Sequence, residues 1–276
     1  MTRSALVLGG GGITGIGWEL GILHGLATAG LDLTGADLVV GTSAGSVVGA
    51  QVTSGRPLQE LYDVQLRPAT GEIAANLSRL TLLRLVPPLL IPGGSREKRA
   101  RIGRMALKAH PPGDERRVEV IRGRIGDIGW PDRDLKVTAV RADTGELAVF
   151  DATSGVDLVH AVAASCAVPL VWPPVTVGGH DYVDGGVRSA ANVDLASGYD
   201  VVVVLAPIAR ALSRATSIAS QLERTGASRT AVVSPDAEAV AAIGRNALDP
   251  SKRADAARAG LRQAAAVLDE VRAAWV

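Results

Sequence analysis

A run of four glycines, Gly9 to Gly12, follows directly on a short apolar segment in the stretch SALVLGGGG (residues 4–12). Glycine loses more conformational freedom on folding than other residues, by roughly 0.5–1 kcal/mol relative to alanine inside a regular element. Four in succession therefore indicate that the chain needs bare backbone at this point. It could turn tightly for packing, cradle a phosphate, or direct N–H groups at a reacting oxygen. The stretch after it, from Gly15 to Gly30, has the apolar spacing of a helix.

The same arrangement recurs immediately afterwards. Residues 38–40 are apolar and predict a buried strand, and Ala44 to Val52 predict a helix of small residues that packs closely against its neighbours. Strand, helix and strand within about 40 residues form a βαβ unit, which implies a parallel sheet with a right-handed crossover. We therefore expect an α/β protein with a mainly parallel central sheet. Further strand patterns follow at 135–150, 174–184, 200–208 and 230–234, and the Ala-rich last 40 residues predict helices.

The length and composition predict one folded domain over residues 1–276. Hydrophobic residues make up 47% of the chain, enough for a full core, and no linker separates two halves. Residues 57–130 are mixed, with helical pieces, proline-rich breaks and the Arg-rich run SREKRARIGR, and predict a helical cap or excursion within that domain. This segment also contains LTLLRLVPPLLIP (residues 80–92), whose Arg84 and three prolines argue against a membrane span.

The charge and cysteine content exclude several classes of function. Lys and Arg number 29 against 28 Asp and Glu, so the overall charge of +1 gives no electrostatic case for binding nucleic acid. The single cysteine, Cys166, rules out an internal disulfide and a multi-cysteine zinc site, and it is interpreted as a small buried core residue. Neither a metal nor a cofactor is expected, and a cytoplasmic location is the default.

Of the three interpretations of the glycine loop, phosphate binding has the weakest support. Gly10, Gly12 and Gly15 satisfy the dinucleotide pattern G-x-G-x-x-G, but Asp37 lies at the start of the second strand rather than at its far end, where a ribose would need it. A Walker loop fails because no Gly-Lys-Ser/Thr follows. The far end of the second strand instead carries Gly41-Thr42-Ser43-Ala44-Gly45, the G-x-S-x-G pattern of a nucleophile elbow. The alternative for these five residues is a plain turn with a helix-capping hydroxyl.

The run Gly9 to Gly12 and the pentapeptide Gly41 to Gly45 should both emerge at one edge of the sheet, because consecutive parallel strands usually lie side by side. If Ser43 is a nucleophile, the glycine run therefore lies close to it. The Gly11 and Gly12 N–H groups could then form an oxyanion hole. A base is also needed. His160 or His180 would complete a Ser-Asp-His triad in hydrolase order, whereas His24 and His110 are better explained as helix and loop residues. Asp184, which follows a strand and precedes Gly185 and Gly186, is the other candidate, although it could also belong to an ordinary Asp-Gly turn.

Taken together and in this order, these segments resemble the patatin-like phospholipase family. The resemblance rests on Gly10 to Gly15, GILHGLATAG, Gly41 to Gly45, ASCAVPLVWPPV and Asp184-Gly185-Gly186, and it covers roughly residues 1–55 and 135–206. It implies a three-layer α/β/α fold and hydrolysis of the acyl esters of lipids by a Ser-Asp dyad without a catalytic histidine. By this resemblance Ser43 is the nucleophile, Asp184 the general base, and Gly10, Gly11 and Gly12 the oxyanion hole, supported by the turn glycines Gly15, Gly41, Gly45, Gly185 and Gly186.

The chain departs from the family pattern at two places. Thr14 occupies the position where the family usually has Arg or Lys after the glycines, so cationic help for the oxyanion must come from elsewhere. This motivates an alternative, a weak or inactive patatin-like module with a lipid-binding or regulatory role. Asn192-Val193-Asp194 replaces the family's Asn-x-Pro and is interpreted as a turn variation.

The expected partner is a lipid or simple ester, and residues 80–92 suggest how one could be approached. This apolar segment, followed by five basic residues between Arg96 and Arg104, could form an apolar lip beside a basic patch for peripheral contact with a membrane. It could equally be an internal packing helix followed by a solvated Arg-rich face. The sequence leaves the head group, the chain length and the oligomeric state open.

Overall fold

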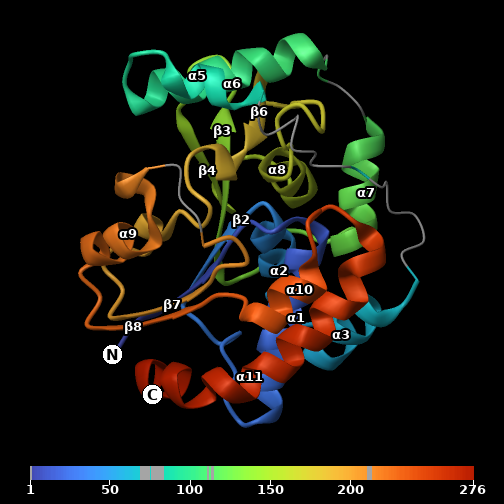
Figure 1. The fold of residues 1–276 in the computed structure, drawn as a ribbon, viewed down its shortest axis with the longest axis vertical. Coiled ribbons are helices and arrows are strands. Elements are labelled where there is room, and N and C mark those ends of the chain that lie inside the picture. Colours follow the sequence, from blue (N-terminus) through green and yellow to red (C-terminus); the bar gives the residue numbers. More distant parts are fainter. Residues whose placement is uncertain (1, 69–74, 76–83, 111, 113–114, 210–212) are drawn as a thin grey trace.

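The computed structural model describes residues 2–68, 75, 84–110, 112, 115–209 and 213–276. At its centre lies an eight-stranded sheet in the order β5-β6-β3-β2-β1-β7-β8, with β4 paired to β3 outside this path (Figure 1). Strands β1, β2, β3, β7 and β8 are parallel, and β4, β5 and β6 run antiparallel to their partners. The strands are β1 (Ser4–Leu8), β2 (Leu38–Thr42), β3 (Asp134–Arg141), β4 (Leu147–Phe150), β5 (Val175–Val177), β6 (His180–Asp184), β7 (Val201–Leu205) and β8 (Arg229–Val233).

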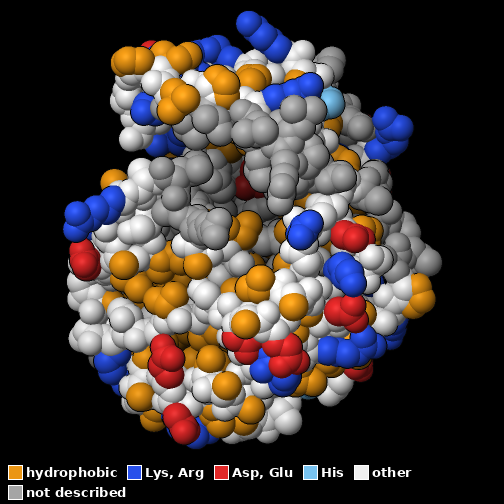
Figure 2. Space-filling model, in the orientation of Figure 1, with side chains coloured by type: hydrophobic (Ala, Val, Ile, Leu, Met, Phe, Trp, Pro, Cys, Tyr) orange, Lys and Arg blue, Asp and Glu red, His pale blue; other side chains and the backbone are white. Residues whose placement is uncertain are grey.

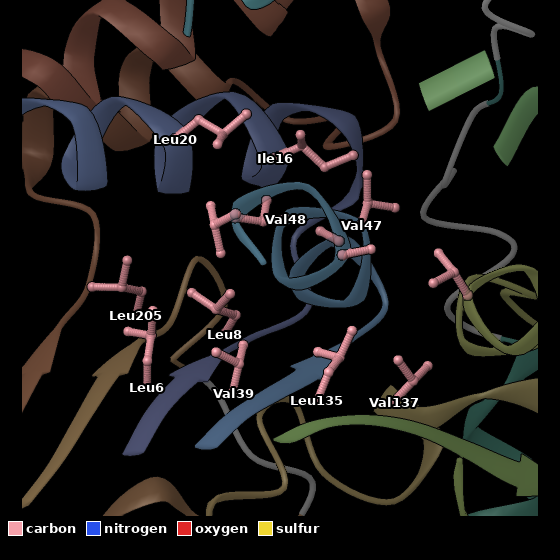
Figure 3. Packing of buried hydrophobic residues seen from close by; sticks show 14 of the residues in the cluster. Leu6, Leu8, Ile16, Leu20, Val39, Val47, Val48, Leu135, Val137 and Leu205 are labelled. Carbon is pink, nitrogen blue, oxygen red and sulfur yellow. The ribbon is translucent and has the colours of Figure 1, made fainter. Parts of the chain in front are cut away.

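One face of the sheet carries the larger part of the core. Alternate residues of the central strands, among them Leu6, Val39 and Leu135, point to this face and meet α1 (Gly12–Thr28) and α2 (Ala44–Val52), as Figure 3 shows. The layer also contains α8 (Leu158–Ser165), α10 (Ala237–Ile243) and α11 (Arg253–Trp275). Because side chains alternate along a strand, the intervening residues belong to the opposite face.

That opposite face has its own, smaller core. Ala5, Val7 and Val40 pack there with residues of α9 (Ile218–Thr225) and of the short 3-10 helix η2 (Val193–Ala196). Farther along, Val140 and Val183 pack against α6 (Ser95–Ala109). Helices therefore cover both faces, and the predicted three-layer α/β/α architecture with a mainly parallel sheet is confirmed.

Helices α1 and α11 pack at unusually close range. Gly17, Gly21 and Gly25, spaced four residues apart, form one face of α1, and a Cβ at Gly21 would lie 2.2 Å from the carbonyl oxygen of Ala257. The indole N–H of Trp18 donates across the same interface to Gln263 over 2.9 Å. The glycines let the long C-terminal helix lie directly on the helix that follows the first glycine loop, and so fix the position of that loop.

The helices between residues 57 and 130 contact different parts of the core. α3 (Leu58–Leu66) lies beside α1 and α11, α7 (Glu115–Ile125) packs against α2 and α8, and α6 crosses the far end of β3 and β6 (Figure 1). The short helix α5 (Val86–Leu90) precedes α6. Residues 69–74, 76–83, 111 and 113–114 of the predicted cap, among them residues 80–83 of the apolar segment, lie outside the described residues. That residues 1–276 form one domain with a cap at 57–130 stays a prediction.

The arginines of α6 bind neighbouring parts of the chain. Arg96, Arg99 and Arg104 donate to backbone oxygens in the turn between β3 and β4, at residues 143–145. Arg101 donates to the carbonyl oxygens of Ile91 and Pro92. Much of the Arg-rich run therefore holds the helix in place. Within the described part of the chain, no helix combines the length and apolarity that a membrane crossing requires.

Candidate active site

The site lies where two strands meet end to end along one edge of β3. β4 pairs with residues Val137 to Val140 of β3, so β2 and β6 share the other edge. β2 ends with Thr42 opposite Thr138, and β6, running the other way, ends with Asp184 opposite Ala139. The residues that follow β2 and the last residue of β6 are thereby brought face to face, although 141 positions separate Ser43 from Asp184.

Ser43 has the strained backbone of a nucleophile elbow. Its φ of 53° and ψ of −117° are sparsely populated for a residue with a side chain. Close packing around it depends on Gly41 and Gly45, where a Cβ would lie 2.5 Å from the Cα of Ser46 and 2.1 Å from the carbonyl oxygen of Leu8. The predicted turn glycines are thus required by the approach of α2 to the first two strands.

Hydrogen bonds hold this conformation from two sides. The Ser43 N–H donates to the hydroxyl of Ser165 over 2.9 Å, and the Ser43 carbonyl accepts from the Ser46 hydroxyl over 2.7 Å and from the Cys166 thiol over 3.3 Å. Sequence reasoning missed this role of Ser165 and Cys166. Cys166 is buried, as predicted, and burial raises the pKa of its thiol, which keeps it protonated and able to donate.

The Ser43 hydroxyl donates to Asp184 over a distance of 2.6 Å between Oγ and Oδ2. The other carboxylate oxygen, Oδ1, accepts the N–H of Gly186 over 2.7 Å. A Cβ at Gly186 would come within 2.9 Å of that oxygen, and one at Gly185 within 2.4 Å of the Thr138 hydroxyl. The two glycines after the aspartate therefore allow the chain to turn back tightly beneath the carboxylate and orient it.

Asp184 is a stronger base than an ordinary aspartate. It is only 5% exposed, and burial raises its pKa from 3.8 to about 6, while the hydrogen bonds from Ser43 and Gly186 and the charge of Arg117 lower it. The carboxylate is still largely ionised at neutral pH. This combination of basicity and charge suits a group that accepts a proton directly from a hydroxyl.

The glycine loop presents N–H groups beside Ser43. The Gly10 N–H donates to the carbonyl oxygen of Ala190 and is therefore engaged within the protein. By contrast, none of the described residues accepts a hydrogen bond from the N–H of Gly11, Gly12 or Ala44. Gly12 and Ala44 begin α1 and α2, so their N–H groups are at the positive ends of two helix dipoles. Ala44, which sequence reasoning missed, joins Gly11 and Gly12 as a candidate donor.

A small pocket lies beside Ser43. Its volume is about 20 Å³, and its lining includes Gly12, Ser43, Ala44, Trp172 and Leu248, together with Arg117 and Arg124 of α7. A second cavity of about 450 Å³ adjoins it and shares Ile13, Ile16 and Arg124 with it. The face in Figure 2 is hollowed between its upper part and the main body, and an acidic side chain is visible in the depth of the hollow.

A family model described as patatin-like phospholipase matches residues 6–197, more than two thirds of the chain. The chain belongs to this family. The match includes the glycine loop, the elbow at Ser43 and the Asp184-Gly185-Gly186 turn, so the family predicted from these motifs is confirmed.

Two solved structures are similar to this chain along nearly its whole length. VipD from Legionella pneumophila aligns with a TM-score of 0.50 at 13% identity, covering 97% of this chain and 67% of VipD. ExoU, in its complex with SpcU from the type III secretion system of Pseudomonas aeruginosa, aligns with a TM-score of 0.43 at 17% identity, covering 98% and 52%. The chain therefore spans about half the length of ExoU. A comparison with curated protein sequences found no significant match.

Thr14, the departure from the patatin pattern, anchors the glycine loop. It is fully buried, and its N–H and its hydroxyl both donate to the carbonyl oxygen of Ala247, each over 3.2 Å. Gly15, next to it, leaves room for Pro207. A longer basic side chain is thus replaced by one that ties the loop to the segment before α11.

Asn192, first interpreted as part of a turn variation, connects three parts of the site. Its side-chain amide donates to the hydroxyls of Thr42 over 3.0 Å and Thr138 over 3.2 Å, and its oxygen accepts from Arg188 over 2.7 Å. Its φ of 50° is left-handed, a conformation that asparagine tolerates better than most residues. Asn192 therefore holds the end of β2 and the middle of β3 against the loop that follows Asp184.

The residues weighed for a triad or a nucleotide site lie elsewhere. His24 stacks on Tyr62 with 4.9 Å between ring centroids, and His160 binds Asp157 at the start of α8. His180 is exposed at the beginning of β6, the opposite end from Asp184. Asp37 accepts the N–H of Ser4 at the start of the first two strands. Among the described residues, no histidine hydrogen-bonds to Ser43 or Asp184, which favours the dyad over the triad.

Proposed function

We propose that this protein is a serine acyl hydrolase that cleaves carboxylic esters of lipids through a Ser43-Asp184 dyad. The observation that carries the proposal is the 2.6 Å hydrogen bond from a strained, buried serine to an aspartate whose pKa burial raises to about 6. Membership of the patatin-like phospholipase family supports the same chemistry.

In the first half-reaction, Ser43 Oγ attacks the ester carbonyl while its proton passes to Asp184 Oδ2. The carbonyl oxygen becomes an anion that the N–H groups of Gly11, Gly12 and Ala44 stabilise, typically by about 3 kcal/mol per donor. Collapse of this intermediate releases the alcohol, which takes the proton from Asp184 and leaves an acyl-enzyme. In the second half-reaction, Asp184 accepts a proton from water as the water attacks, and the proton returns to Ser43 as the fatty acid leaves.

A fluorophosphonate probe tests the nucleophile, because it reacts covalently only with an activated serine. We expect labelling of Ser43 in the folded protein, loss of labelling in Ser43→Ala, and retention in Ser54→Ala, which removes a hydroxyl from the turn after α2. Turnover of p-nitrophenyl esters should require Asp184, and kcat/KM should rise with pH through about 6 as its carboxylate ionises. Full turnover by Asp184→Asn would reject the dyad, and loss of turnover on changing His160 or His180 would favour a triad.

The alternative function is a weak or inactive patatin-like module that binds lipid. Thr14 motivates it, because the glycine loop itself provides no cation for the oxyanion. Lipid binding without any labelling of Ser43 would favour this alternative.

We further propose peripheral contact with a membrane through the end of α5. Leu90 is 76% and Ile91 50% exposed, and Figure 2 shows apolar and basic side chains gathered at the top of the molecule, over α5 and α6. Sedimentation with anionic vesicles, weakened in a Leu90→Ser, Ile91→Ser variant, tests this contact. Unchanged sedimentation of that variant would exclude this surface.

A further inference from the structure

Helix α7 directs two arginines at the predicted nucleophile. Arg117 and Arg124 are seven residues apart, a spacing that places both on the same face of a helix two turns apart. Both line the small pocket that contains Ser43. The Gln51 side chain donates to the Arg124 carbonyl oxygen over 2.8 Å and ties this part of α7 to α2, the helix that begins next to Ser43.

Arg117 is a buried cation fixed in orientation. Only 4% of it is exposed, and its guanidinium lies over the ring of Trp172, 4.4 Å from the centroid. Trp172 lines the same pocket. A guanidinium cation over the face of an aromatic ring is favourably placed, and this contact holds the charge of Arg117 at the wall of the pocket.

The charge of Arg117 acts on the groups around Ser43. It lowers the pKa of Asp184 and that of Cys166, in both cases against the larger effect of burial. Electrostatic interactions are strong here because Arg117, Asp184 and Cys166 are all buried. An anion that entered the pocket would therefore be attracted to Arg117.

Arg124 lies where the small pocket joins the larger cavity. It lines both, together with Ile13 and Ile16, and the larger cavity continues along the apolar side chains of Val47 and Val64. A ligand with one apolar chain and one anionic group could place the chain along these residues and the anion near the two arginines.

We propose that Arg117 and Arg124 determine specificity by binding an anionic group, a phosphate or a carboxylate, that the ester substrate carries next to the scissile bond. This inference rests on the proposed hydrolase function, since it concerns the substrate of the same site. Guanidinium groups bind phosphates and carboxylates through paired, charge-assisted hydrogen bonds. Uncharged esters of the same chain length would enter the pocket without that contribution.

The test measures binding of three amphiphiles with the same chain, decyl phosphate, decanoate and decanol, below their micellar concentrations. Isothermal titration calorimetry measures their affinities directly, and inhibition of p-nitrophenyl butyrate turnover measures competition at Ser43. We expect at least one anion to bind more tightly than decanol by roughly tenfold or more, the effect typical of a charge-assisted hydrogen bond. The ratio of the two anions then identifies phosphate or carboxylate as the preferred group.

Two variants and one control locate the effect. Arg117→Met and the less buried Arg124→Met should each reduce the preference for the anion by about tenfold. Arg116→Met, the same change at an exposed position of the same helix, should leave it unchanged. Arg124→Met keeps the test decisive if Arg117→Met does not fold.

Failure of this inference can be told from failure of the proposed function. Equal binding of all three amphiphiles, or an anion preference unchanged in both variants, overturns the role of the arginines even where the fluorophosphonate still labels Ser43. An equal loss of affinity for anions and for decanol also overturns it, because it would reveal a general role in shaping the pocket. Absence of labelling, with anion binding retained and dependent on Arg117, would overturn the hydrolase and keep the anion site.

Discussion

Replacing Asp184 by Asn should abolish ester turnover and at the same time make the protein more stable at neutral pH. The carboxylate is almost completely buried, and its pKa is raised from 3.8 to about 6. A pKa change of one corresponds to 1.36 kcal/mol, so ionising this carboxyl group in the folded protein costs about 3 kcal/mol more than in the unfolded chain. The amide of an asparagine is neutral, and it can keep hydrogen bonds to Ser43 and Gly186.

The pH dependence of this effect follows from the direction of the shift. Between about pH 4 and pH 6 the folded state binds more protons at Asp184 than the unfolded state, so wild-type stability falls as the pH rises through this range. Above about pH 6 the full cost is present. The stability of Asp184→Asn relative to wild type should therefore be near zero at pH 4, grow towards pH 6 and level off at no more than about 3 kcal/mol.

Denaturant unfolding of both proteins at pH 4, 6 and 8 measures this difference. For a chain of this size, 1 kcal/mol corresponds to roughly 2 °C in melting temperature, so thermal unfolding should show a gain of several degrees at pH 8. Asp132→Asn, at an exposed position, is the matched control and should change little. A variant less stable than wild type at pH 8, or a difference independent of pH, would refute the reasoning, because burial would then not be the cause of the shift.

Other changes probe the support of the site. Burial raises the pKa of Glu19 in α1 well above its ordinary value, so Glu19→Gln should be stabilising at pH 8 and not at pH 4, as denaturant unfolding at both values would reveal. Gly21→Ala forces α1 away from α11 and should cost roughly 1–3 kcal/mol in the free energy of unfolding, whereas Gly123→Ala, a helical position with open space around it, should be neutral or slightly stabilising. Asn192→Ala leaves the buried hydroxyls of Thr42 and Thr138 without their donor and should lower the free energy of unfolding by about 1–3 kcal/mol. It should also lower kcat for p-nitrophenyl esters more than it changes KM. Equal kcat in the variant and the wild type would contradict a positioning role.

The sequence was most informative where the backbone itself imposes the requirement. Gly41, Gly45, Gly185 and Gly186 lie where a side chain would collide with neighbouring atoms, and such positions are visible in the sequence as glycines flanking Ser43 and following Asp184. Strand and helix patterns likewise predicted the first two βα units and their shared edge. Here, local chemistry and spacing correspond directly to structure.

Contacts between distant segments could not be predicted in the same way. Ser165 binds the backbone of Ser43, and Asn192 binds Thr42, yet no periodicity or spacing relates them because tertiary packing alone brings them together. The Arg-rich run was ambiguous for a similar reason. Its charge suggested a surface patch, whereas several of its arginines bind the turn between β3 and β4, whose position depends on the whole sheet.

Arg117 illustrates the same limit. The spacing of Arg117 and Arg124 was visible in the sequence, but nothing indicated that this face of the helix is directed at Ser43 rather than at solvent. Gly10 shows the same limit, because it was predicted as part of the oxyanion hole, whereas its N–H donates to the carbonyl oxygen of the distant Ala190.

The end-to-end meeting of β2 and β6 makes the spacing of the dyad depend on the length of a third strand. One residue added to β3 between Thr138 and Ala139 would move the aspartate about 3.3 Å along the sheet and reverse the faces of all the residues beyond it. Residues added in the exposed turn after β4, at 152–155, would leave that alignment intact. An insertion in this protein should therefore be tolerated only if it leaves unchanged the number of β3 residues between the partner of Thr42 and the partner of Asp184. Its distance in sequence from Ser43 and Asp184 should matter less.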